Sequence, residues 1–207
     1  MTKEQLNQKQ VILEASGQLY MKHGIKSVSM DDLARHLGIS KKTIYLYYEN
    51  KEALVEDIVF SHVEKERIEV TNILETSINA IDQMQKIANM ALRTLEEISS
   101  GTMFDLQKYY RKQWFSISSL HKELIFGVIK QNIERGIDEG IYRDNINAAI
   151  IARLYSEMAF NIINDDVFPI KDFDKQVLYR QTFHYHINGI LSPKGDRIFQ
   201  ELNSTSK

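Results

Sequence analysis

One short stretch of the chain concentrates side chains that can bind an anion. Lys41 and Lys42 stand at the start of a predicted helix, and Thr43, Tyr45 and Tyr47 follow them with hydroxyl groups. The helix dipole favours negative charge at a helix N-terminus, so two lysines there are unfavourable unless an external anion meets them. Phosphate groups accept hydrogen bonds from lysine and hydroxyl side chains, and the phosphate backbone of DNA is therefore the partner that this stretch suggests.

The residues before this helix predict how it is held. Ser29 and Asp32 have the spacing of a capping box and start a first helix, which ends at Gly38. Ser40 then caps a second helix, from Lys41 to about Tyr48, whose Ile44 and Tyr48 are four residues apart and are expected to face inward. Two short helices joined by so tight a turn form a helix-turn-helix, whose second helix enters the major groove of DNA. The alternative is a solvated polar face on a small helical module.

The helix-turn-helix interpretation assigns a role to each polar side chain. Lys41, Lys42 and Thr43 lie in the first turn and are expected to reach base edges, since lysine suits guanine O6 and N7. Hydroxyl groups and a further lysine are expected to contact phosphates. The expected phosphate contacts are Ser29, Tyr45, Tyr47 and Lys51.

These residues resemble the DNA-binding domain of the tetracycline-repressor (TetR) family over roughly residues 8–58. In that family the position of Leu46 is often aromatic, so this chain departs from the pattern there. Residues 136–143 resemble a second family segment, which precedes the eighth helix. The first resemblance rests on Gly24, Ser27-Val28-Ser29, Leu33-Ala34, Gly38-Ile39-Ser40, Thr43-Ile44-Tyr45, Tyr48, Asn50-Lys51-Glu52 and Leu54.

The resemblance implies a homodimer that binds a double-stranded DNA operator and responds to a small-molecule effector, most often as a repressor. It also implies that the last two long helices, expected at 147–164 and 172–191, pair with their mates in the dimer. The candidates for that seam are Met158, Ile162, Tyr185 and Gly189.

Composition sets the broad class. The 207 residues are 43% hydrophobic and 26% charged, which is typical of a globular protein. There is no run of 18 apolar residues and no signal-peptide pattern, so we expect no membrane association. The absence of cysteine fits a cytoplasmic location. The net charge of −2 is low for a DNA-binding protein, but residues 1–50 hold 7 Lys and Arg against 5 Asp and Glu.

Helical periodicity runs through the chain, and no alternating strand pattern interrupts it. We therefore predict an all-α protein of about nine helices. Residues 1–49 would form the helix-turn-helix domain, and residues 50–207 a helical ligand-binding and dimerisation domain. No glycine or proline occurs from Asn50 to Ser100, so a stiff helix from Asn50 to about Leu74 should join the two.

A cluster of aromatic residues between 103 and 115 is the candidate for a ligand site. Aromatic residues at helical spacing are commonly core, but several of these bring a polar group that needs a partner when buried. Small-molecule pockets combine apolar walls with a few such groups. The predicted effector is small and mostly apolar or aromatic. Its predicted contacts are His62, Phe104, Tyr110, Trp114, Tyr155 and Met158.

Catalysis finds little support in the sequence. His184 and His186 point to different sides of a helix, and His62 with Glu66 lacks the further ligands of a metal site. There is no glycine-rich phosphate loop or nucleophile elbow. We expect no enzyme activity, no metal and no cofactor. The DNA-binding regulator is the leading hypothesis, with a helical protein-interaction module and a small helical enzyme as alternatives.

Overall fold

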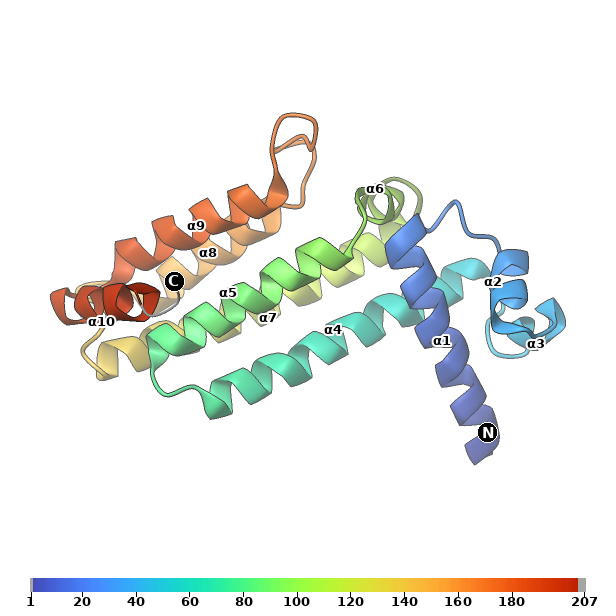
Figure 1. The fold of residues 1–207 in the computed structure, drawn as a ribbon, viewed down its shortest axis with the longest axis horizontal. Coiled ribbons are helices and arrows are strands. Elements are labelled where there is room, and N and C mark those ends of the chain that lie inside the picture. The colour runs from blue at the N-terminus through green and yellow to red at the C-terminus, as the bar shows by residue number, and fades with distance from the viewer. Residues whose placement is uncertain (1, 205–207) are drawn as a thin grey trace. The chain divides into compact units, whose positions relative to one another are not determined.

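The computed structural model describes residues 2–204, and in that range the chain is all α-helical, as predicted (Figure 1). The only β-type pairing among these residues is one isolated bridge between Tyr142 and Leu191. The helices are α1 (Lys3–His23), α2 (Met30–Leu37), α3 (Lys41–Tyr45), α4 (Lys51–Thr76), α5 (Ala80–Glu97), α6 (Ser100–Tyr109), α7 (Arg111–Asp138), α8 (Ala148–Asn161), α9 (Lys175–Ile190) and α10 (Pro193–Ser204).

The chain divides into two compact units. The first comprises Met1–Lys65 and Glu96–Ser118, and the second Glu66–Leu95 and Ser119–Lys207. This division differs from the predicted one at residue 49, because α6 and the start of α7 belong with the helix-turn-helix. Helix α4 is continuous, as predicted, and contributes residues to both units.

The first unit is built around the buried faces of α1, α2 and the start of α4. Thr2 and Gln5 form a capping box at the start of α1, and Gly24 ends that helix with a φ of 87°. Ile12, Leu33 and Leu54, one from each helix, are fully buried in a single cluster. The polar surface of α2 and α3 is therefore carried on a packed three-helix base.

Helix α6 holds the C-terminal end of α1. The hydroxyl of Thr102 donates to the carbonyl of Tyr20 at 2.5 Å, and the amide of Ser99 donates to the carbonyl of Met21 at 3.0 Å. The carboxylate of Asp105 accepts a hydrogen bond from the amide of Lys26 at 2.7 Å. The Tyr20 carbonyl also accepts from the Gly24 amide at 2.9 Å, whereas the Met21 carbonyl is one of the last in α1 and receives its donor from outside the helix.

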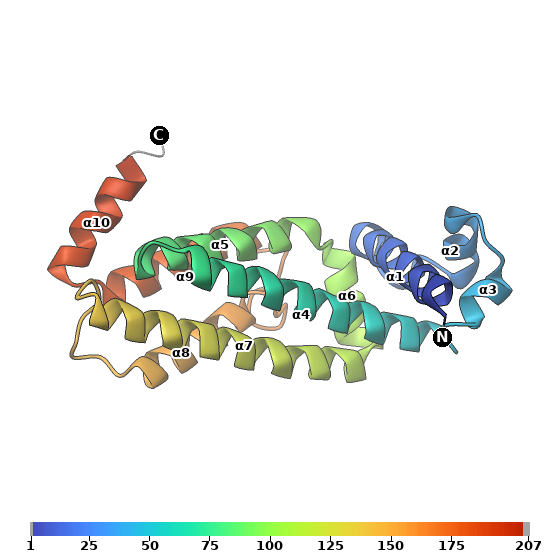
Figure 2. The ribbon, with the colours of Figure 1, turned by 90° about the horizontal axis from the view of Figure 1, so that it is seen from below.

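The second unit has its main core among α5, α7, α8, α9 and α10. Helices α8 and α9 run side by side, as Figures 1 and 2 show. A smaller cluster joins Val70 of α4 to Ile87 of α5 and Val128 of α7.

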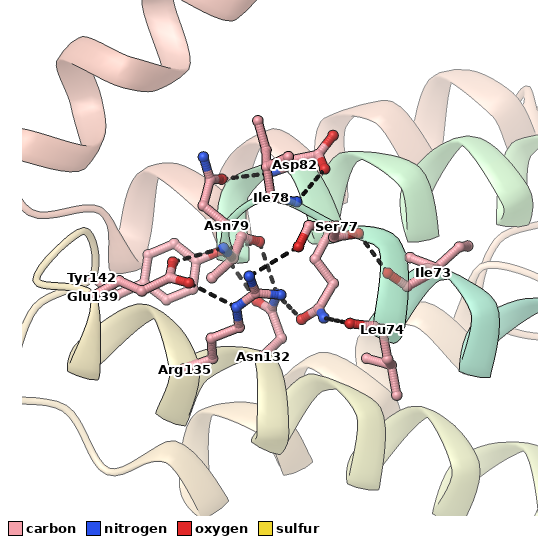
Figure 3. A network of polar contacts seen from close by, with 12 residues as sticks. Ile73, Leu74, Ser77, Ile78, Asn79, Asp82, Asn132, Arg135, Glu139 and Tyr142 are labelled. Carbon is pink, nitrogen blue, oxygen red and sulfur yellow. Dashed lines mark hydrogen bonds and ion pairs between the residues drawn. The ribbon is translucent and has the colours of Figure 1, made fainter.

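A buried polar network fixes the start of α5 against α7 (Figure 3). The amide of Asn132 donates to the carbonyl of Ala80 and to the side chain of Gln83, both at 2.8 Å. The hydroxyl of Tyr142 donates to the same carbonyl at 3.1 Å. Glu139 accepts from the Ala80 amide at 2.8 Å. Because each polar group has a partner, the network costs little to bury.

The number of helices was predicted too low, because α10 was missed. Ser192-Pro193 was interpreted as the end of the last helix, and α9 does end at Ile190. However, the Ser192 hydroxyl accepts from the Gly195 amide at 3.1 Å, and proline is well suited to the first position of a helix. The same two residues therefore begin α10. Helix α10 extends through Asn203 to Ser204, and residues 205–207 lie outside the described range.

Several other boundaries differ from prediction. Residues 99–101, expected to end a helix, instead begin α6 with Ser99 as its cap. Helix α8 ends at Asn161 and not near residue 164, and α9 begins at Lys175, capped by Asp174, and not at residue 172. No helix within residues 2–204 is long and apolar enough to cross a membrane.

Candidate nucleic-acid interface

The helix-turn-helix is held by the predicted local contacts. The Ser29 hydroxyl accepts from the Asp32 amide, and the Asp32 carboxylate accepts from the Ser29 amide at 2.9 Å. Gly38 has the left-handed conformation, with a φ of 66°, and closes α2. The Ser40 hydroxyl then accepts from the Thr43 amide at 3.0 Å and starts α3.

Helix α3 is shorter than predicted. It ends at Tyr45, and the chain continues through a turn to Tyr48. Ile44 and Tyr48 are buried on the inner side, as predicted from their spacing, with exposed fractions of 0% and 2%. These anchors leave the outward side of α3 free of packing.

Lys42 is the most available cation of α3. Its side chain is exposed and makes no hydrogen bond or ion pair with any residue in the range 2–204. Tyr45 is exposed on the same short helix. A lysine without a protein partner at the start of a recognition helix has all three N–H groups free for a nucleic acid.

Lys41 is already paired. Its ammonium Nζ lies 2.9 Å from Oδ2 of Asp31, at the start of α2. The hydrogen bond from Lys41 to that carboxylate raises the pKa of Lys41 above its usual value. The two lysines of α3 therefore present different electrostatic environments to a ligand.

Two predicted phosphate contacts, Tyr47 and Lys51, are engaged within the protein. The Tyr47 hydroxyl donates to the side-chain carbonyl of Gln8 at 2.9 Å. The Lys51 ammonium donates to the carbonyls of Ile25 and Val28, the latter at 2.6 Å. Partial burial lowers the pKa of Lys51, although nearby carboxylates oppose the shift. The Lys51 side chain thus ties the segment between α1 and α2 to the start of α4.

The remaining predicted contacts stay at the surface. Ser29 is exposed, and its hydroxyl donates to Asp32 at 2.6 Å. The Thr43 hydroxyl lies 2.8 Å from that of Ser40. Leu46, for which no role was predicted, is 73% exposed at the end of α3. Its type gave no polar signal, although its position four residues after Lys42 places it on the same side of the helix.

The predicted ligand residues fall into both units. In the first, Tyr110 is buried and Trp114 packs against the same cluster, while His62 is partly buried and Phe104 is exposed. In the second, Tyr155 is buried in the core and Met158 packs against it.

The core of the second unit contains a polar group that the sequence did not single out. His186 is buried against the ring of Tyr155, with ring centroids 4.3 Å apart, and burial lowers its pKa to about 4. The Tyr155 hydroxyl lies 3.4 Å from that of Tyr179. The sequence analysis considered His186 only as a metal ligand. Its spacing from the apolar residues Phe183 and Ile190 of α9 could have indicated that it is buried.

One seam residue predicted for the dimer is placed elsewhere. Ile162 is 1% exposed and belongs to the core of its own chain, so it cannot be a seam residue as predicted. Tyr185, at 76% exposed, and Gly189 lie at the surface of α9. The prediction failed because the periodicity of α8 identifies an apolar face without saying what covers it.

A packed helix-turn-helix with an exposed, unpaired lysine at the start of its second helix is the arrangement of a DNA-binding domain. Comparison with known proteins agrees. Residues 12–58 match the profile of "Bacterial regulatory proteins, tetR family". The uncharacterized regulator YvaF of Bacillus subtilis (strain 168) is 27% identical over 146 residues, which cover 70% of this chain and 75% of YvaF. The chain thus carries the DNA-binding domain of the TetR family of transcriptional regulators.

Further similarities extend over most of the chain. The transcriptional repressor KstR2 of Mycobacterium tuberculosis is 18% identical over 160 residues, covering 69% of this chain and 72% of KstR2. Its structure, described as a ketosteroid transcriptional regulator, matches 89% of this chain and 95% of its own with a TM-score of 0.59 and 15% identity. The structure of a TetR-family regulator of Agrobacterium tumefaciens matches 91% of this chain and 100% of its own, with a TM-score of 0.70 and 12% identity. At these identities the structures establish the fold.

Proposed function

We propose that this regulator is a cytoplasmic repressor that binds its operator as a homodimer, without a catalytic step, and leaves it when a small, mostly apolar molecule binds. The DNA-binding part of the proposal rests on the exposed, unpaired Lys42 of α3, a helix held in place by the buried side chain of Ile44. The name of KstR2 supports repression and an apolar effector by analogy alone.

The ligand part of the proposal rests on side chains in each unit. Tyr110 and Trp114 of the first unit, and Tyr155 and Met158 of the second, combine apolar surface with hydroxyl and N–H groups. We retain His62 as a polar contact. Phe104 is the weakest candidate, because its ring is 48% exposed with the Lys108 ammonium 4.9 Å from its centroid.

Continuity of α4 supports a route for regulation. Residues 51–65 of this unbroken helix belong to the first unit and residues 66–76 to the second. A ligand that changes how the second unit holds α4 therefore acts on the helix that carries Lys51 and the helix-turn-helix base. By linkage, ligand and DNA must weaken each other by the same factor, typically about 5–150-fold.

The dimer part is supported by exposed apolar side chains on two neighbouring helices. Ile150 and Leu154 of α8 are 60% and 56% exposed, and Val177 and Tyr185 of α9 are 56% and 76% exposed. A single recognition helix reaches few base pairs, whereas two can read half-sites one helical turn apart. Leu154→Glu should yield a 24.1 kDa monomer by analytical ultracentrifugation where the unaltered chain sediments as a dimer. A monomeric unaltered chain at micromolar concentration would contradict this part.

The experiment that tests the proposal uses DNA from upstream of the protein's own gene. Gel shift should show retention of that DNA by the full chain. The neutral fluorescent probe N-phenyl-1-naphthylamine should then bind less tightly in the presence of the DNA than in its absence. Trp114→Ala and His62→Ala should each weaken probe binding. Equal probe affinity with and without DNA would contradict ligand-controlled release, and failure to retain any DNA would contradict the function as a whole.

A further inference from the structure

The surface that faces DNA carries charges of both signs. Helix α2 begins with Asp31 and Asp32, and α3 begins with Lys41 and Lys42. Asp32 has a structural role, because its carboxylate accepts hydrogen bonds from the amide and the hydroxyl of Ser29 at 2.9 and 2.6 Å. Asp31 has no part in that capping box, although it lies in the first turn of α2, where the helix dipole favours negative charge.

The position of Asp31 is defined by Lys41. Oδ2 of Asp31 lies 2.9 Å from Nζ of Lys41, and their side chains are 58% and 46% exposed. An ion pair this exposed contributes little to folding, since solvent screens it. Its consequence for a charged ligand is larger, because Asp31 is fixed in the first turn of α2 and its negative charge remains near Lys41 whether or not the ion pair is closed.

A carboxylate beside Lys41 affects phosphates and bases differently. A DNA phosphate is an anion and is repelled by Asp31 at the same time as Lys41 attracts it. A base edge such as guanine O6 or N7 is a neutral acceptor and meets no such repulsion. The Lys41 ammonium has three N–H donors, so it can keep one hydrogen bond to Asp31 and donate another to a base.

We infer that Asp31 is a specificity-determining residue, which removes Lys41 from sequence-independent phosphate binding and leaves it available to base edges. The inference rests on the DNA-binding function of the α2–α3 surface. On this account Lys42, which has no partner in residues 2–204, supplies the phosphate attraction of α3 in addition to a base contact, and Lys41 supplies little phosphate attraction. Asp31 thus lowers affinity for random DNA more than affinity for the operator.

The test is a double-mutant cycle with Asp31→Asn and Lys41→Met in the full chain. Two duplexes serve as probes, a 30-base-pair duplex of random sequence and one selected from a random pool by the unaltered protein. Asp31→Asn should tighten binding to random DNA about 3–10-fold near 0.1 M salt and steepen its log–log salt dependence by about 0.9, the value for one added phosphate contact. Binding to the selected duplex should tighten less, so the specificity ratio falls.

The cycle also distinguishes an effect that acts through Lys41 from the general effect of removing one negative charge. In the Lys41→Met background, Asp31→Asn should change random-DNA affinity less than about 2-fold, because the cation it releases is gone. Lys41→Met alone should leave the salt slope on random DNA unchanged. Asp166→Asn removes one exposed carboxylate from the second unit and is the charge-matched control, expected to be nearly neutral.

Three results would overturn the inference. They are an unchanged salt slope for Asp31→Asn, an effect of equal size with and without Lys41, and an equal effect of Asp166→Asn. Circular dichroism of each variant checks that α2 is intact, since Asp31 also lies in its favourable first turn. If the unaltered protein binds neither duplex, the DNA-binding function fails as well, and that outcome is distinct from the other three.

Discussion

The ammonium group of Lys51 lies against the carbonyls of Ile25 and Val28, with the ring of Tyr20 at 5.3 Å. The sequence suggested a phosphate contact for this lysine. Its contacts instead show a structural role, because those carbonyls belong to the segment that leads into α2 and Lys51 holds that segment against the start of α4. Its effect on DNA binding should therefore come through the position of α2.

Lys51→Met should lower the stability of the protein by about 1–3 kcal/mol, because two carbonyls lose a charged donor. Its affinity for all DNA sequences should fall, while the salt slope of binding stays the same. Thermal unfolding and a salt titration measure the two effects. Lys42→Met is the matched control, and it should flatten the slope without changing the melting temperature. A flattened slope for Lys51→Met with unaltered stability would restore the phosphate contact.

Burial of His186 should make stability depend on pH. Its folded-state pKa of about 4 lies below the unfolded value near 6.5, so between these values the folded state binds fewer protons than the unfolded state. This contribution is fully present above pH 6.5 and is lost as the pH falls toward 4. Lowering the pH from 7 to 5 should cost about 2 kcal/mol through His186.

Urea unfolding of His186→Leu at pH 7 and pH 5 tests this expectation. The variant should lose about 2 kcal/mol less than the unaltered protein between the two pH values. His184→Leu, which changes the exposed neighbouring histidine, is the control and should keep the full pH dependence. An identical pH dependence in all three proteins would show that His186 does not titrate as its burial requires.

Side-chain roles were predictable from the sequence where they are local. The Ser29–Asp32 capping box and the inward Ile44 and Tyr48 follow from spacing alone, and the structure confirms them. The roles of Lys41 and Lys51 depend on partners 10 and 23 residues away, Asp31 and Val28. Spacing along one helix carries no information about such partners.

At the scale of elements, α6 belongs to the same compact unit as the helix-turn-helix, although the sequence analysis placed it in the other domain. Its residues satisfy the end of α1 through Thr102, Ser99 and Asp105. Gly24 fits this arrangement closely, since a Cβ at that position would lie 3.3 Å from the Asp105 carboxylate. Helix α6 is therefore part of the support of the DNA-binding surface.

Thr102→Val should destabilise the first unit by about 1 kcal/mol, because the hydroxyl donor to the Tyr20 carbonyl is lost while the side-chain shape and the donor from the Gly24 amide are kept. Amide hydrogen exchange should increase at the C-terminal end of α1 and stay the same in α8 and α9. Thr102→Ser retains the donor and should restore protection. Unchanged exchange in α1 of the valine variant would exclude α6 as a support.

The elements themselves were largely predictable, because strong caps and apolar periodicity mark α1, α2 and α8. Helix α10 was missed because a Ser-Pro pair is equally compatible with the end of one helix and with the start of the next. The assignment of α6 could not be predicted, since its contacts reach residues about 80 positions away.

At the scale of the whole molecule, the continuous helix α4 contributes residues both to the unit that carries the DNA-binding surface and to the second unit. Residues 1–50 hold only 7 Lys and Arg against 5 Asp and Glu, and one of these cations, Lys41, is paired with Asp31. The next lysine along the chain, Lys51, is used within the protein. Sequence-specific binding must therefore depend on few cationic contacts, doubled in the proposed dimer.

The most direct test of the central claim is selection of binding sites from a random-sequence DNA pool by the unaltered chain and by Lys42→Ala. The unaltered chain should enrich two half-sites related by two-fold symmetry, with centres about 10 base pairs or a multiple of this apart. Lys42→Ala should lose the preference at one position of each half-site and weaken binding by about 1–3 kcal/mol. Enrichment of no sequence, or an unchanged preference in Lys42→Ala, would contradict the claim that α3 reads DNA.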